Sequence, residues 1–126
     1  MWNYVAVALG GVVGCCARYG VSQAVHNFYG RGTFPLATLI INVSGCLLMG
    51  FLFQLTLDKA NVSYSLRLAI LTGVLGGFTT FSAFAMETLL LAEEGEMGSA
   101  ALYILMSVSM GLLAAYIGVW CARSIV

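Results

Sequence analysis

The sequence predicts an all-α membrane protein with four transmembrane helices in a single domain spanning residues 1–126, and three observations lead to that fold class. Of the 126 residues, 61% are hydrophobic and only 8% are charged, whereas a soluble domain carries roughly 25% charged residues. The mean hydropathy is +0.99. One bilayer crossing takes about 20 mostly apolar residues, so the chain has room for four crossings and little else.

Short polar or glycine-containing segments separate the expected helices. The first connector, from His26 to Pro35, holds two glycines and the only proline, which are typical of turns. The second connector begins at Asp58, and an acidic turn begins at Glu93. These separators place the helices at about residues 4–25, 36–57, 66–92 and 98–122.

Small residues recur at the spacing that favours helix packing in lipid. Gly10 and Gly14 form one pair four residues apart, and Gly73 and Gly77 form another. Because close backbone approach is a main source of helix association in membranes, a compact bundle or a dimer is expected.

The distribution of charged residues does not fix the orientation of the chain across the membrane. Four crossings place both termini on one side, with Lys59, Arg67 and Arg123 there, while Arg31 lies on the other side and Arg18 is nearest to it. Since Lys and Arg set the orientation of membrane proteins, this near balance permits insertion both ways. The net charge is zero with no basic run, which argues against nucleic acid as a partner.

The middle of the third segment carries the most informative stretch, Gly76-Gly77-Phe78-Thr79-Thr80-Phe81-Ser82-Ala83-Phe84. Each glycine costs about 1 kcal/mol in a helix interior, and the β-branched threonines add to that cost. One interpretation is a helix break near the bilayer centre, where freed carbonyl groups can bind a cation. The alternative is an unbroken helix whose glycines allow close packing.

Polar side chains in the second and fourth segments offer two more candidates. The second segment carries a stripe of polar and small residues on one helix face: Thr38, Asn42, Cys46 and Gly50. The Asn42 amide has two N–H donors, either for a helix–helix hydrogen bond or for a passing anion. Tyr103 and Ser107 form a hydroxyl pair on the fourth segment, but Gly111 and Ala115 further along that face have no hydroxyl.

Aromatic and charged residues complete the candidate set. Phe81 and Phe84 share a helix face, and Phe78 extends the row. They either make apolar contacts or present their electropositive ring edges to a small anion. Glu87 is the one acid within a predicted helix, and such acids indicate function. Arg18 either extends to the membrane interface or attracts anions into a vestibule.

The cysteines give no sign of a metal or redox centre. They lie in apolar segments without Cys-x-x-Cys spacing, so we expect small buried side chains at Cys15, Cys16, Cys46 and Cys121. His26 stands alone and gives no nucleophile–base pair. The sequence therefore does not indicate an enzyme.

The motifs and their order resemble the Fluc (CrcB-type) fluoride channel family over the whole chain. The resemblance rests on the third-segment motif, on Asn42 within Ile41-Asn42-Val43-Ser44-Gly45, and on Gly14-Cys15-Cys16-Ala17-Arg18-Tyr19. It implies a fluoride-selective channel that exports F⁻ passively across the bacterial inner membrane and lowers cytoplasmic fluoride. It also implies an antiparallel, dual-topology homodimer with two pores, whose partners are fluoride, a second copy of the chain and membrane lipid.

By position in these motifs, the resemblance also implies the residues that do the work. A structural Na⁺ at the dimer centre would be held by the backbone carbonyls of Gly76 and Thr79, and Arg18 would lie in the vestibule. The expected fluoride pore is formed by Asn42, Phe81, Phe84, Tyr103, Ser107, Thr38 and Glu87. Gly111 and Ala115 depart from the hydroxyl pattern of the family's fourth helix.

Two other functions fit the composition. A small four-helix, dual-topology, proton-coupled drug exporter has a similar size, but such exporters use a membrane-embedded Glu in the first helix, and this first segment has no acid. A non-transporting accessory subunit that only binds a partner would leave the third-segment motif unexplained.

Overall fold

The computed structural model describes residues 1–30, 32–58 and 62–125, and these residues form helices and no strand. Four helical spans are long and apolar enough to cross a membrane: Trp2–Tyr29, Leu36–Leu57, Tyr64–Glu93 and Met97–Arg123. The all-helical architecture with four such spans is therefore confirmed, and the chain is a multi-pass membrane protein.

The first helix is longer than the sequence suggested. Helix α1 comprises Trp2–Tyr29 and ends at Gly30, whose φ of 76° lies in the left-handed region that favours glycine. The expectation that a connector begins at His26 is wrong, because no residue before Gly30 interrupts a helix. Helix α2, Leu36–Asp58, begins directly after Pro35, a position where a missing N–H costs no helical hydrogen bond.

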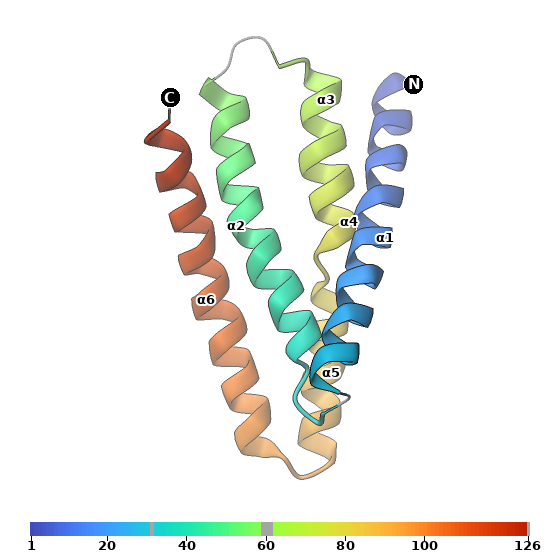
Figure 1. The fold of residues 1–126 in the computed structure, drawn as a ribbon, viewed down its shortest axis with the longest axis vertical. Coiled ribbons are helices and arrows are strands. Elements are labelled where there is room, and N and C mark those ends of the chain that lie inside the picture. The colour runs from blue at the N-terminus through green and yellow to red at the C-terminus, as the bar shows by residue number, and fades with distance from the viewer. Residues whose placement is uncertain (31, 59–61, 126) are drawn as a thin grey trace.

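The third span is made of several pieces. It comprises α3 (Tyr64–Leu68), the π-helical η1 (Ala69–Leu75), α4 (Gly76–Phe78) and α5 (Phe81–Glu93). Between α4 and α5, Thr79 and Thr80 have extended backbone angles, and this non-helical pair is visible in the third span in Figure 1. We call it the Thr79–Thr80 link. The two glycines of the motif are themselves helical, so the link follows them.

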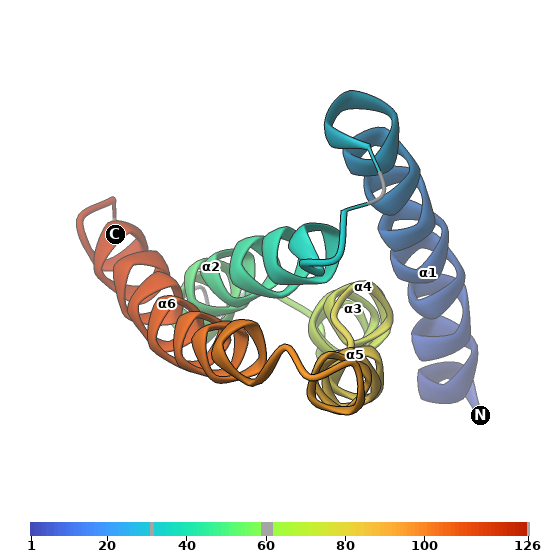
Figure 2. The same cartoon turned by 90° about the horizontal axis from the view of Figure 1, so that it is seen from below.

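The helices pack as two adjoining pairs. Helix α2 packs along α6 (Met97–Arg123), and α1 packs along η1 and α4, while α5 reaches across to α6 (Figures 1 and 2). Both termini lie at the same end of the bundle (Figure 1), as expected for four crossings. Arg31 and Lys59 lie outside the described residues, so the predicted balance of charge across the membrane stays a prediction.

Glycines bring α1 into backbone contact with the third span. A Cβ on Gly10 would meet the carbonyl oxygen of Ala69, and one on Gly14 would meet that of Val74. From the other side, a Cβ on Gly77 would lie 2.8 Å from the Gly11 carbonyl oxygen. The same close approach joins α2 and α6 at Gly50 and Gly118. Because these glycines have no side chain, the backbones of α1 and the third span, and those of α2 and α6, lie in close contact. We call these two contact lines the backbone seams.

Candidate functional site

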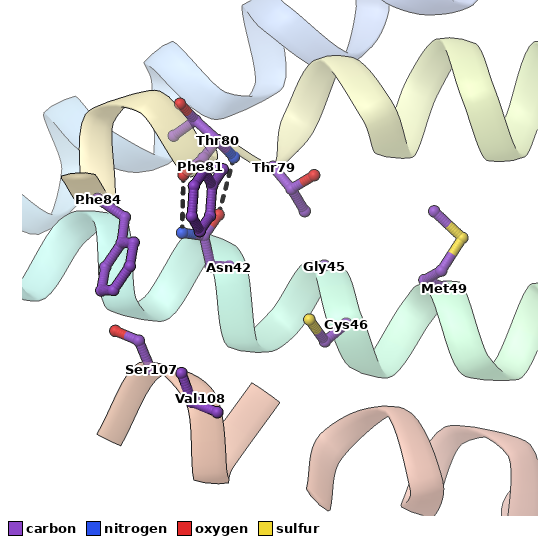
Figure 3. Close-up of a pocket in the computed structure, with 10 residues that line it drawn as sticks. All are labelled: Asn42, Gly45, Cys46, Met49, Thr79, Thr80, Phe81, Phe84, Ser107 and Val108. Atoms are coloured by element: carbon purple, nitrogen blue, oxygen red, sulfur yellow. Dashed lines mark hydrogen bonds between the residues drawn. The ribbon is translucent and has the colours of Figure 1, made fainter. Parts of the chain in front are cut away.

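The Asn42 side chain holds the Thr79–Thr80 link from α2. Its Nδ2 donates to the Thr80 carbonyl oxygen at 3.0 Å, and the Thr80 N–H donates to Asn42 Oδ1 at 2.8 Å (Figure 3). The Thr80 hydroxyl in turn accepts from the Ala83 N–H at 3.2 Å and caps α5. One side chain therefore satisfies both backbone groups that an extended Thr80 withdraws from the helix. Within the described part of the chain, the second amide hydrogen of Asn42 has no partner.

The carbonyl end of α4 is only partly satisfied. The N–H and the hydroxyl of Thr79 both donate to the Leu75 carbonyl oxygen at 3.0 Å. The Thr79 carbonyl oxygen accepts a long contact of 3.4 Å from Arg18 Nη1. No described residue donates to the Gly76 carbonyl oxygen. Helix C-termini carry negative partial charge, so this end suits a cation.

A cavity of about 280 Å³ lies beside the link, between α2, α5 and α6. Figure 3 shows its wall, which contains Asn42, Gly45, Cys46, Met49, Thr79, Thr80, Phe81, Phe84, Ser107 and Val108. We call it the central cavity. Its lining carries no ionisable acid or base apart from the Cys46 thiol. Ser107 Oγ is buried and has no hydrogen-bond partner among the described residues, a rare and costly state for a hydroxyl.

A second polar cluster forms around Glu87, one helical turn from Phe84. Thr38 Oγ1 donates to Glu87 Oε1 at 2.7 Å, and the Tyr103 hydroxyl donates to Oε2 at 2.7 Å. Tyr103 is 0% exposed and Thr38 is 7% exposed. These distances are typical of hydrogen bonds to a carboxylate. The cluster ties α2, α5 and α6 together through three side chains.

The predicted hydroxyl pair on the fourth helix is therefore divided between two places. Tyr103 directs its hydroxyl to Glu87, whereas Ser107 lines the central cavity. Although these two residues are four positions apart on one helix face, they do not share an environment, because the long tyrosine side chain reaches a different neighbour.

Aromatic rings connect the two clusters. The ring centroids of Phe81 and Phe84 are 5.6 Å apart, and those of Phe84 and Tyr103 are 5.2 Å apart. Phe34, from the first connector, meets Tyr103 edge-on at 5.6 Å. The expectation that Phe78 extends the row is wrong, because it precedes the link and its ring lies against Gly45 of α2. The contact of Phe34 with Tyr103 was not predicted from the sequence, because Phe34 lies in a connector and has no helical spacing to other residues.

Arg18 extends to the link from α1. Besides its contact with the Thr79 carbonyl, its Nη2 lies 3.8 Å from Cys15 Sγ. Arg18 also lines a cavity of about 470 Å³ together with Thr38, Thr80 and Glu87. Glu87 in addition borders a cavity of about 600 Å³ beneath the first connector. Both cavities border Glu87.

The cysteines do not behave alike. Cys15 and Cys16 are exposed on α1, so the expectation that all four are buried is wrong for these two, because the described helices leave their side chains uncovered. Cys46 and Cys121 are half-buried.

Comparison with known proteins places the chain in a family. Residues 5–119 match the family described as "CrcB-like protein, Camphor Resistance (CrcB)". The chain belongs to this CrcB-like family. It is 50% identical over 118 residues to a "Fluoride-specific ion channel FluC" of Acidithiobacillus ferrooxidans, with 94% of each chain covered. It is 42% identical over 125 residues to the protein of the same name in Geobacter sulfurreducens, covering 99% of this chain and 100% of the relative.

Membership of the CrcB-like family confirms the resemblance found in the sequence motifs. A third relative, also named "Fluoride-specific ion channel FluC", comes from Methylobacillus flagellatus and is 42% identical over 118 residues, or 94% of this chain and 92% of the relative. These matches give no support to the drug-exporter alternative, and α1 contains no acidic residue.

Proposed function

We propose that this chain is a fluoride-selective ion channel that lets F⁻ leave the cell passively across the inner membrane and so lowers cytoplasmic fluoride. Its place in the CrcB-like family and the printed names of its relatives support this function. The observation in the chain itself that supports it most is the unpaired, buried Ser107 hydroxyl on the wall of the central cavity.

The free groups of the central cavity are suited to an anion. Asn42 uses its amide oxygen to accept from Thr80, and it retains one N–H for a ligand. Ser107 offers an O–H, and the rings of Phe81 and Phe84 offer electropositive edges. Fluoride needs donors to replace its hydration shell, while conduction needs binding weak enough for release. Neutral donors meet both needs, because a fixed positive charge would retain the ion.

The Glu87 cluster and Arg18 serve the approach to this cavity in our proposal. Thr38 and Tyr103 belong to the pore wall beside Glu87, and the Arg18 guanidinium provides positive charge in the vestibule. A positive group in a cleft with low-dielectric walls raises the local concentration of anions.

We further propose an antiparallel, dual-topology homodimer with two pores, in which the Thr79–Thr80 link acts as a functional break of the third span. Phe81, a pore residue of the proposal, is 79% exposed in the single chain, and Gly76 is exposed as well. A second copy related by a two-fold axis would cover both with the same surface of its own. The balance of Lys and Arg permits opposite insertion.

A structural Na⁺ between the two links is part of the same proposal. The Gly76 and Thr79 carbonyls would hold it, since carbonyls at interrupted membrane helices suit Na⁺, and the Gly76 oxygen has no other partner among the described residues. The ion would supply positive charge that offsets the carbonyl dipoles meeting at the dimer centre.

Ion flux from proteoliposomes tests the function directly. Vesicles containing the purified chain and loaded with fluoride should release it down its gradient, whereas vesicles loaded with chloride should not. Release should need no proton or sodium gradient, and protein-free vesicles provide the baseline. Equal release of both halides, or release only with a proton gradient, would overturn the proposal.

Single-particle imaging of the protein in lipid tests the assembly. The expected image shows two oppositely oriented copies meeting at their Thr79–Thr80 links, with density for an ion between the Gly76 carbonyls. Parallel copies, or links far from the two-fold axis, would contradict it.

A further inference from the structure

The face of α6 that follows Ser107 has a gap. One turn beyond Ser107 stands Gly111, which has no side chain and is buried. A hydroxyl pathway that continued along α6 would need a polar side chain there. Gly111 provides no such side chain at this position of α6.

A thiol from the neighbouring helix fills the space at this gap. A Cβ placed on Gly111 would lie 3.5 Å from Cys46 Sγ, which is ordinary van der Waals contact. Cys46 also lines the central cavity together with Ser107, and Figure 3 shows both on its wall. The Cys46 sulfur therefore lies next to the position that a side chain at residue 111 would occupy.

A second observation, at Ser107, indicates that this cavity binds a ligand. Ser107 Oγ is buried, unpartnered among the described residues, and lines the same cavity as Cys46. Since buried hydroxyls nearly always have partners, a ligand of this cavity is expected to accept from Ser107. The S–H group is a weak donor, and it belongs to the same cavity wall as Ser107.

We propose that the Cys46 thiol supplies the polar contact that follows Ser107 along the anion pathway, in place of a hydroxyl at position 111. This inference rests on the proposed fluoride function. It assigns a pathway role to a residue of α2 that helical spacing on α6 cannot reveal. It also means that the pathway contains a natural site for thiol modification.

The chemistry of the test is simple. Methyl methanethiosulfonate is small and neutral, so it can enter a mostly apolar cavity. The Cys46 sulfur attacks its sulfenyl sulfur, an S–S bond forms to an S–CH₃ group, and the S–SO₂ bond breaks. Methanesulfinate leaves and the thiol proton passes to water; the thiol is oxidised and the reagent's sulfonyl sulfur is reduced. The added group would project into the central cavity.

Three variants in fluoride-loaded proteoliposomes separate the possibilities. Cys46→Ser should give a faster initial efflux than Cys46→Ala, because a hydroxyl is a better donor than a thiol. Cys46→Ala should lower the initial efflux rate about fivefold, the effect of losing one modest hydrogen bond. The reagent should remove most efflux from the unaltered protein and from Cys121→Ser, the control for a thiol outside the cavity, and should leave Cys46→Ser active.

Mass spectrometry of the treated protein keeps each outcome informative. Full labelling of Cys46 with unchanged efflux would overturn the proposal, as would unaltered efflux in Cys46→Ala. Failure to label Cys46 in the folded protein, with labelling after unfolding, would also overturn it, because the thiol would then not face an open cavity. Absence of fluoride efflux from the untreated protein would instead refute the channel function, whatever the labelling shows.

Discussion

The two halves of the third span are held in opposite ways. Before the Thr79–Thr80 link, η1 and α4 lie against α1 with backbone on backbone, through glycines such as Gly14 and Gly77. After the link, α5 is held by side chains, through the Glu87 cluster and the contact of Phe84 with Tyr103. An atom added at Gly14 or Gly77 would therefore meet backbone, while the second half depends on particular functional groups. The first half is a rigid support, and the second carries the polar chemistry.

The largest expected effect comes from adding one methyl group to the backbone seam. Gly14→Ala would press its Cβ against the Val74 carbonyl, which belongs to the backbone of η1 and cannot rotate away. We expect a loss of about 3 kcal/mol in stability and a fall of about 10 °C in the thermal midpoint. The fraction of protein that stays monodisperse in detergent on heating measures it.

Gly11→Ala is the matched control for this change. It adds the same methyl group to the same helix, but nothing lies within 4 Å of its Cβ. An equal loss of stability in both variants would show that helix α1 itself, and not the seam, is sensitive.

The next effect concerns the side chain that joins the two halves. Asn42→Asp retains an oxygen that accepts from the Thr80 N–H, but it loses the donor to the Thr80 carbonyl and adds a negative charge on the central cavity. We expect fluoride efflux from proteoliposomes to be abolished, because the charge repels the anion. Asn27→Asp, on an exposed face of α1, should retain efflux. Normal efflux in Asn42→Asp would remove Asn42 from the pathway.

A smaller effect is expected at the second half's polar anchor. Glu87→Ala removes the acceptor of two hydroxyls and leaves the fully buried Tyr103 O–H without its partner. The cost should be about 2 kcal/mol, seen as a lower thermal midpoint. Glu93→Ala, an exposed acid on the same helix, should change the midpoint little. A stable Glu87→Ala protein would show that the cluster does not anchor α5.

The smallest effect separates the two phenylalanines. Phe84→Ile removes ring contacts with both Phe81 and Tyr103, worth about 1 kcal/mol. Phe81→Ile should cost less stability, since Phe81 is 79% exposed in the chain. Both variants should reduce fluoride efflux without unfolding the protein. Thermal midpoints and efflux measured on the same preparations check this, and a greater loss of stability in Phe81→Ile would contradict it.

Properties that depend on local composition were predictable from the sequence. Hydropathy alone locates the four spans, because a bilayer crossing is defined by the length of an apolar run. The pairs Gly10 with Gly14 and Gly73 with Gly77 also predicted close packing, and in the structure Gly10 and Gly73 lie against each other. The spacing of the glycines predicted close helix packing, but it did not indicate which helix would be the packing partner.

Partnerships between distant residues were not predictable. The bond of Asn42 to Thr80 requires that Thr80 be extended, which no pattern in α2 can indicate. Tyr103 and Ser107 share a helix face, yet the length of the tyrosine side chain takes its hydroxyl to Glu87. The exposure of Cys15 likewise depends on which neighbours α1 lacks. Each of these facts is a property of three-dimensional packing and not of spacing along one helix.

The paired hydrogen bonds between Asn42 and Thr80 act as a gauge of length. Both bonds fit only when the backbone of Thr80 lies one short amide away from α2. A glutamine would push that backbone outward by a methylene, and a serine would fall short of it. The length of the side chain at position 42 thereby sets the distance between α2 and the start of α5, and with it the width of the cavity beside them.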